Sequence, residues 1–173
     1  DISSWTPGET PDLIYSNATL QWLPDHQNLF PRLAGYLDNG GCLAVQMPLS
    51  WSATSHRLMR ETLVDCGVGT EALRQAVARK WVEDADVYYD MLSGCCTSLD
   101  IWETEYLQAL EGEDPVLEWV KGTGLRPILN GLNDEERDTY LAEYHRRLRE
   151  AYPARKDGVT LYPFRRLFIV ACV

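Results

Sequence analysis

Several features are scarce or missing in this 173-residue sequence, and each absence excludes a class of protein. No apolar run reaches the roughly 18–20 residues of a membrane-spanning helix, so we expect no membrane partner. No basic and apolar leader opens the sequence, so no targeting signal is visible. Basic residues are few, with 16 Lys and Arg against 26 Asp and Glu and a net charge of −10. A chain this acidic repels phosphate backbones, so nucleic acid is not expected as a partner.

Cysteine spacing also excludes familiar patterns. The five cysteines stand at positions 42, 66, 95, 96 and 172, with no CxxC and no histidine at zinc-site spacing. We therefore expect neither a disulfide framework nor a metal site, and a reducing, cytoplasmic location. The Cys95-Cys96 pair could be a vicinal redox pair, but two small hydrophobic side chains are the simpler interpretation. His26, His56 and His145 lack partners at ligand spacing and are expected on surfaces or helix faces.

The composition that remains is that of a folded protein. Hydrophobic residues make up 45% of the chain and charged residues 24%, values typical of globular domains. The length suffices for one domain with a sizeable core. Because the sequence has no repeats and no low-complexity tract, we expect residues 1–173 to form a single domain.

The first fifty residues follow the order strand, helix, strand. Residues 12–18 are a short apolar run, which predicts a buried parallel strand. Apolar residues then recur at helical spacing from Leu29 to Leu37 and stop at a glycine turn, residues 38–41. Residues 42–48 are a second apolar run, which ends at a proline. This order is typical of a crossover unit in an α/β sheet.

The remaining segments alternate helices and strands. Helices are predicted over residues 50–66 and after three start signals: Thr70, Asp114-Pro115 and Asn133, which has the capping-box spacing to Glu136. Strands are predicted over residues 98–106 and 164–171. The sequence therefore predicts an α/β fold.

Charge is distributed unevenly. Residues 1–50 hold 5 acidic and 1 basic residue, residues 51–114 hold 13 and 5, and residues 115–173 hold 8 and 10. A basic region in an acidic chain is expected where a small anion is collected. A solvated helix that is rich in arginine is the alternative interpretation.

Six stretches resemble the class I S-adenosylmethionine-dependent methyltransferases, and they cover nearly the whole chain in the family's order. Within that family they are most similar to the branch that methylates trans-aconitate, and the fifth stretch is the most specific. The resemblance implies the fourth to seventh strands of a Rossmann-like sheet, with helical insertions at 51–98 and 107–158 that cap the acceptor pocket. The stretches are NATLQWLPDH at 17–26, LAVQMP at 43–48, YYDML at 88–92, LDIWETEY at 99–106, WVKGTGLRP at 119–127 and RLFIVA at 166–171.

Part of the family pattern is missing. The family holds its cofactor with a glycine-rich turn after the first strand and an acidic residue at the end of the second, and this sequence has neither. By the same pattern Asp1 and Ile2 match the pair that contacts the adenine ring. We therefore expect an N-terminally truncated chain that has lost its activity. The strand at 12–18 would then have an open apolar edge, through which we expect self-association.

The resemblance implies S-adenosylmethionine as the cofactor. Asn17, Ala18, Gln21 and Trp22 match the family loop beside its methionyl and sulfonium end. Trp22 could offer a π face to the cation and a wall to the acceptor. Simple packing of the tryptophan is the alternative.

The implied acceptor is a small anionic metabolite, trans-aconitate or a similar polycarboxylate. Arg126, in the glycine-rich segment 122–127, and Arg166 are candidate ligands because a guanidinium binds a carboxylate with two hydrogen bonds. Tyr88 and Tyr89 could donate hydroxyl groups to the acceptor. Solvated positions for the arginines and core positions for the tyrosines are the alternatives.

The implied reaction forms a methyl ester. A carboxylate is already ionised at pH 7, so we expect no general base, no catalytic residue and no metal. Orientation of the reactants would supply the catalysis. Two alternatives stay open: a methyltransferase for another small acceptor, and a non-catalytic binding or structural module.

Overall fold

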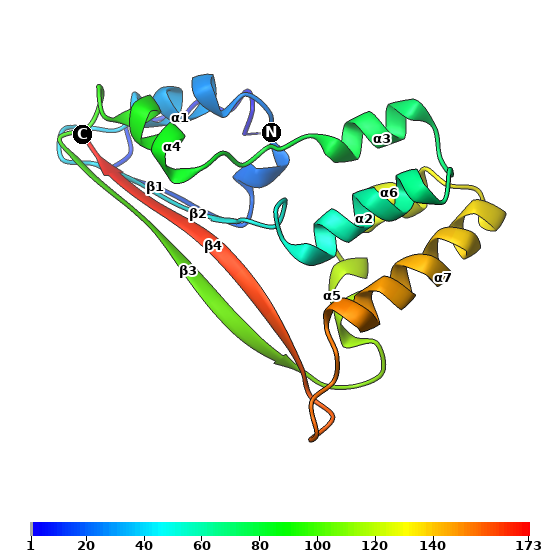
Figure 1. Ribbon diagram of the computed structural model, residues 1–173. Coiled ribbons are helices and arrows are strands. Elements are labelled where there is room, and N and C mark those ends of the chain that lie inside the picture. The colour runs from blue at the N-terminus through cyan, green and yellow to red at the C-terminus, as the bar shows by residue number, and fades with distance from the viewer. Residues whose placement is uncertain (1) are drawn as a thin grey trace. The chain divides into compact units, whose positions relative to one another are not determined.

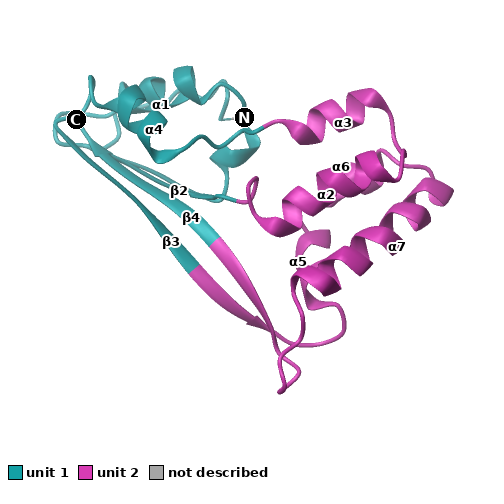
Figure 2. Ribbon diagram, viewed as in Figure 1, with its two compact units in different colours: residues 1–49, 80–105, 165–173 teal, residues 50–79, 106–164 magenta. Residues whose placement is uncertain are grey.

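The computed structural model describes residues 2–173, which divide into two compact units (Figures 1 and 2). We call them the sheet unit, with residues 1–49, 80–105 and 165–173, and the helical unit, with residues 50–79 and 106–164. The expected single domain with its insertions stays a prediction, and residues 80–98 of the expected insertion 51–98 fall in the sheet unit.

The sheet has four strands in the order β1-β2-β4-β3. β1 (Leu13–Asn17) runs parallel to β2 (Cys42–Pro48), and β2 pairs antiparallel with β4 (Thr160–Cys172), whose other neighbour is β3 (Ser98–Leu110). This arrangement confirms the predicted α/β class. β1 forms one edge of the sheet, with a single strand neighbour.

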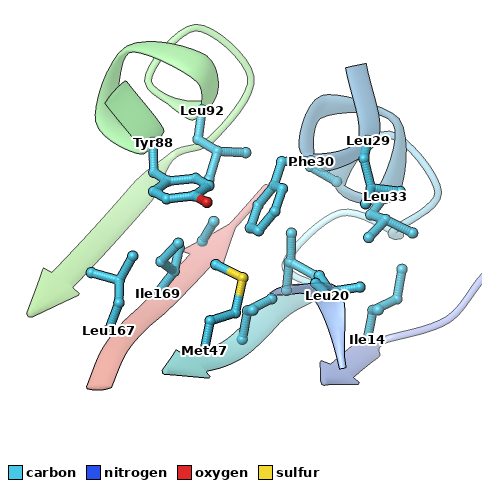
Figure 3. Packing of buried hydrophobic residues seen from close by; sticks show 14 of the residues in the cluster. Ile14, Leu20, Leu29, Phe30, Leu33, Met47, Tyr88, Leu92, Leu167 and Ile169 are labelled. Atoms are coloured by element: carbon cyan, nitrogen blue, oxygen red, sulfur yellow. The ribbon is translucent and has the colours of Figure 1, made fainter. Parts of the chain in front are cut away.

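Two helices cover one face of the sheet. α1 (His26–Ala34) and α4 (Ala85–Leu92) pack over β2 and β4, with Phe30 and Tyr88 in contact with the strand residues below them (Figure 3). Alternation along β2 turns Leu43, Val45 and Met47 toward this core. Helical spacing predicted α1, whereas the helix α4, which contains the stretch YYDML, was not predicted.

The opposite face of the sheet is open at β1. Leu13 and Tyr15 are 58% and 70% exposed, while their neighbour Ile14 is buried. The prediction of a fully buried strand was therefore wrong, although its parallel pairing was right. On the same face, Trp102 of β3 stacks on Phe168 of β4 with ring centroids 5.1 Å apart.

The helical unit is built around α7 (Asp134–Ala151), which packs on α2 (Thr54–Asp65). Local start signals hold: Thr70 caps α3 (Glu71–Ala78), Pro115 opens α5 (Pro115–Lys121), and Asn133 forms a capping box with Glu136. Segment 122–127, expected to be a loop, instead ends in the first turn of α6 (Arg126–Asn130). Three side chains of α7 fill the core of the unit: Tyr140, Tyr144 and Leu148.

One disulfide contradicts the sequence analysis. Cys42 and Cys172 face each other across β2 and β4, and their sulfur atoms are bonded. The two residues are 130 positions apart, so only the antiparallel register brings them together. Cys66, Cys95 and Cys96 are free, and the sulfur atoms of the vicinal pair lie 3.9 Å apart.

Candidate functional site

The loop after β1 is held against the end of β2. The backbone amide of Ala18 donates to the carbonyl of Gln46 over 3.0 Å. Ala18 has φ 50°, in the left-handed region that a residue with a Cβ occupies only at a cost of roughly 1–2 kcal/mol. The carboxyl ends of β1 and β2 meet at this edge, where α/β sheets bind their ligands.

Two further contacts fix the shape of this loop. A short 3₁₀ helix, η1 (Leu20–Trp22), follows Ala18. His26 Nε2 donates to the carbonyl of Leu20 over 2.9 Å, and His26 Nδ1 accepts from the Tyr88 hydroxyl over 2.6 Å. Burial lowers the pKa of His26, which keeps the ring neutral and suits these two roles. His26 is therefore a buried positioning residue on the inner face of α1, which is the helix-face position and not the surface position of the two expected.

The structure places the predicted cofactor residues together on this loop. Asn17, Ala18 and Trp22 are exposed and Gln21 is half-buried. Trp22 is 61% exposed, so core packing does not describe it. Ile2 is half-buried, and its carbonyl accepts from Arg32 over 3.0 Å. Asp1 lies outside the described residues.

Two polar atoms of the loop region are buried without a partner. Within residues 2–173, Ser16 Oγ and Gln21 Oε1 make no hydrogen bond. Buried polar groups are almost always paired in folded proteins, and exceptions mark a missing water, ion or ligand. These atoms therefore support a ligand site at the end of β1.

Arg166 lies at the same end of the sheet. It is half-buried on β4, and its Nη1 donates to Gln46 Oε1 over 3.2 Å. Gln46 in turn is the register partner of Asn17. The structure thus brings Arg166 close to the predicted cofactor loop through Gln46, a residue that sequence analysis missed. The available signal was a single polar residue inside the apolar stretch LAVQMP.

The two candidate tyrosines have different environments. Tyr88 is completely buried, and its hydroxyl also accepts from the backbone amide of Glu83 over 3.1 Å. Burial raises the pKa of Tyr88. Its place corresponds to the core alternative, so it has no surface to offer an acceptor. Tyr89 is exposed on α4.

Arg126 belongs to the helical unit, at the first residue of α6. Its side chain is exposed, and its guanidinium makes no hydrogen bond or ion pair with any of residues 2–173. Most other arginines of the 115–173 region are paired along α7: Arg146 with Glu143 and Glu150, Arg147 with Asp65, and Arg149 with Asp114. The solvated-helix alternative therefore describes the arginines of α7, but this helix holds 4 basic and 6 acidic residues. The basic excess of residues 115–173 lies outside α7, at positions that include Arg126.

A polar network around Ser55 lies in the helical unit, with His56 next to Gly124. Ser55 Oγ is 3.2 Å from His56 Nδ1 and 3.0 Å from the Tyr162 hydroxyl. Burial lowers the pKa of His56 to about 4, so its ring is neutral at pH 7. Ser55 is completely buried and its carbonyl accepts from Tyr144. A serine in this position cannot reach a substrate, so the Ser55–His56 pair is structural and not a nucleophile with its base.

Two kinds of feature are absent from residues 2–173. None of the helices within this range has the length and apolar character that a bilayer-spanning segment needs. No group of three His, Cys, Asp or Glu side chains in the described chain could hold a metal ion.

Comparison with known proteins gives the family. No family model matches the chain. Trans-aconitate 2-methyltransferases from Azoarcus sp. (strain BH72), Methylobacterium nodulans and Streptomyces avermitilis are 44%, 45% and 46% identical to it, over 99% of this chain. The chain spans only 63–66% of the length of these curated relatives.

One solved structure supports the fold alone. The YcgJ protein from Bacillus subtilis matches 99% of this chain and 68% of its own, with a TM-score of 0.51 and 13% identity. The chain therefore belongs to the trans-aconitate 2-methyltransferase family, which confirms the resemblance found in its sequence.

Proposed function

We propose that this chain is part of an S-adenosylmethionine-dependent enzyme that methylates a carboxylate of trans-aconitate or a similar small polycarboxylate. The observation that carries the proposal is an identity of 43–46% over 99% of the chain to relatives named for that reaction. The loop at the end of β1 and the nearby Arg166 supply a matching constellation in the sheet unit.

The residues present fit one end of the cofactor. Gln21 Oε1 is a buried acceptor without a partner within the described chain, which suits an ammonium group. The exposed indole of Trp22 suits a sulfonium. When bound, S-adenosylmethionine supplies an electrophilic methyl group. Asn17 and Ala18 would flank it on the loop.

The reaction needs orientation and no proton transfer to or from the chain. A new bond forms between a carboxylate oxygen and the methyl carbon while the sulfur–carbon bond breaks, and the electron pair of that bond stays on sulfur. An arginine on the reacting carboxylate would weaken the nucleophile. Arg166 would therefore bind a carboxylate that does not react, and correct placement can supply about 7–11 kcal/mol. The same role stays a prediction for Arg126 of the helical unit.

The 173-residue chain by itself is expected to be inactive. Its sequence has no glycine-rich turn of the family type, so it would supply only part of the cofactor cradle. The test compares this chain with a chimera that carries, ahead of Asp1, the part of the Azoarcus relative that the chain does not match. Both are assayed with trans-aconitate and S-adenosylmethionine by mass spectrometry of the ester. An ester from the chimera supports the proposal, and a folded chimera that makes none contradicts it.

An acceptor panel separates the alternatives. Citrate, cis-aconitate and an uncharged alcohol, each offered to the chimera, distinguish a polycarboxylate enzyme from one with another acceptor. A chimera that binds S-adenosylhomocysteine but methylates none of them would favour the binding module. The cytoplasmic location and the capping role of the helical unit stay predictions.

A further inference from the structure

The structure contains a buried side-chain amide, that of Gln46, whose Nε2 donor has no acceptor among residues 2–173. We propose that Gln46 is a ligand of the acceptor: its side-chain amide donates to a carboxylate that is not methylated. This inference rests on the proposed methyl transfer and deepens it, because it names a residue that recognises the substrate.

The orientation of the Gln46 amide is determined by its neighbour. A guanidinium has donors only, so the atom that faces Arg166 Nη1 at 3.2 Å is the carbonyl oxygen of the amide. The Nε2 atom therefore points away from Arg166. Nε2 is buried and finds no acceptor among residues 2–173, and the whole residue is only 5% exposed. Such a donor costs about 1–3 kcal/mol while it stays unpaired, which a bound acceptor atom would recover.

Gln46 lies where a ligand of the sheet is expected. It is near the carboxyl end of β2, beside its register partner Asn17 on β1. Strand alternation places it on the face that carries the Trp102–Phe168 stack, because Phe168 is its register partner on β4. Asn17, Gln46 and Arg166 thus present two amides and one guanidinium at one end of one face.

The chemistry of this group selects an anion. Arg166 already donates to Gln46 Oε1, and the unpaired atom of the amide is the donor Nε2. Glu103 follows Trp102 on β3, so alternation turns it to the other face, where it pairs with Arg165. An unpaired N–H donor beside a guanidinium suits a ligand carboxylate, which accepts several hydrogen bonds.

The first experiment measures binding of trans-aconitate to the 173-residue chain by isothermal titration calorimetry. Gln46→Met keeps the length of the side chain and removes both donors. We expect about ten- to hundredfold weaker binding, the loss for a hydrogen bond to a charged group. Gln27→Met, at an exposed glutamine of α1, is the matched control and should bind like the unchanged chain. Equal binding by Gln46→Met and the unchanged chain would overturn the assignment.

A second measurement uses the unchanged chain, so its outcome does not depend on whether a variant folds. In the unchanged chain, the side-chain amide resonances of Gln46 should shift on addition of trans-aconitate. They should stay in place with its trimethyl ester, which has no carboxylate. If the Gln46 resonances shift with neither compound, in the chain or in the chimera, the assignment of Gln46 to the acceptor is overturned.

Further arms identify the source of the carboxylate. S-adenosylhomocysteine also carries a carboxylate. If Gln46→Met weakens binding of S-adenosylhomocysteine but not of trans-aconitate, the site belongs to the cofactor and the acceptor role is overturned. In the chimera, an unchanged KM for trans-aconitate in Gln46→Met would overturn the inference while the proposed function stands. If the chimera is inactive but its Gln46 resonances shift with trans-aconitate, the inference about Gln46 stands and the proposed function is contradicted.

Discussion

Gly124 lies so close to the imidazole of His56 that a Cβ atom at position 124 would stand 2.6 Å from Nε2. The glycine is therefore required by a contact. It is not among the residues with positive φ, so backbone conformation does not demand it. The contact joins the most specific stretch of the sequence, WVKGTGLRP, to α2 and the Ser55 network. It gives a physical reason for one glycine of the glycine-rich segment 122–127.

Gly124→Ala should destabilise the protein by about 1–3 kcal/mol, the usual cost of overpacking. The His56 ring is held by Ser55 and has little room to turn. Gly122→Ala is the matched control, because its Cβ would meet nothing closer than the Trp119 carbonyl at 3.9 Å. Urea unfolding measures both. Adding His56→Ala to Gly124→Ala should recover part of the loss, and a double variant with purely additive losses would contradict the contact.

Stability should fall with acid because of His56. Its pKa in the folded protein is about 4, below the 6.5 of an ordinary histidine. The unfolded chain therefore binds the proton first, and the stabilisation is complete above pH 6.5 and is lost as the pH falls from 6.5 to 4. The loss reaches roughly 3 kcal/mol. His26, whose pKa is also lowered, acts in the same direction.

Unfolding of His56→Gln at several pH values tests this prediction. Between pH 6.5 and 4, the free energy of unfolding of the variant should change less with pH than that of the unchanged chain. The contribution of His26 should remain in the variant. Histidine NMR resonances give an independent check. A His56 ring that titrates near pH 6.5 in the folded protein would contradict the prediction.

Arg126→Ala should weaken acceptor binding and spare the cofactor. The exposed guanidinium has no protein partner in the described chain, so its loss costs the fold little. In the chimera we expect KM for trans-aconitate to rise about ten- to hundredfold, with binding of S-adenosylhomocysteine unchanged. Arg57→Ala, which removes an exposed ion pair with Glu61 in the same unit, serves as the control. Equal KM values for the two variants would remove Arg126 from the acceptor site.

Thiol counting tests the disulfide. The chain unfolded without reductant should react at three cysteines, and the reduced and unfolded chain at five, because Cys42 and Cys172 are bonded to each other. Cys42→Ser should lower the free energy of unfolding under oxidising conditions by about 2–5 kcal/mol, since the bond closes a long loop. Cys95→Ser, at an exposed free thiol, should change it little. Five reactive thiols in the chain purified and unfolded without reductant would contradict the bond.

The open edge at β1 should make the chain associate with itself. β1 has one strand neighbour, and the apolar side chains of Leu13 and Tyr15 are exposed. Sedimentation velocity should show dimers that increase with concentration. Tyr15→Lys should reduce them because a charge blunts an edge strand, whereas Tyr89→Lys on α4 should not. A monomer at every concentration would refute the prediction.

Local sequence signals predicted much of the fold. The Asn133 capping box depends on a residue three positions away, and the structure forms it as expected. The β1 and β2 runs, the start of α3 at Thr70 and Pro115 at the start of α5 are equally local. The loop that the resemblance assigns to the cofactor, Asn17 to Trp22, is contiguous as well, and its binding role stays a prediction. Such signals can be read because all partners lie within a few residues of one another.

The sequence by itself determined the family, the element order and the loop at the end of β1. Only the tertiary structure decided three pairings: Cys42 with Cys172, Gln46 with Arg166, and Gly124 with His56. Their members are separated by 130, 120 and 68 positions. Strand register and helix packing bring such residues together, and neither is set by the spacing of neighbours along the chain.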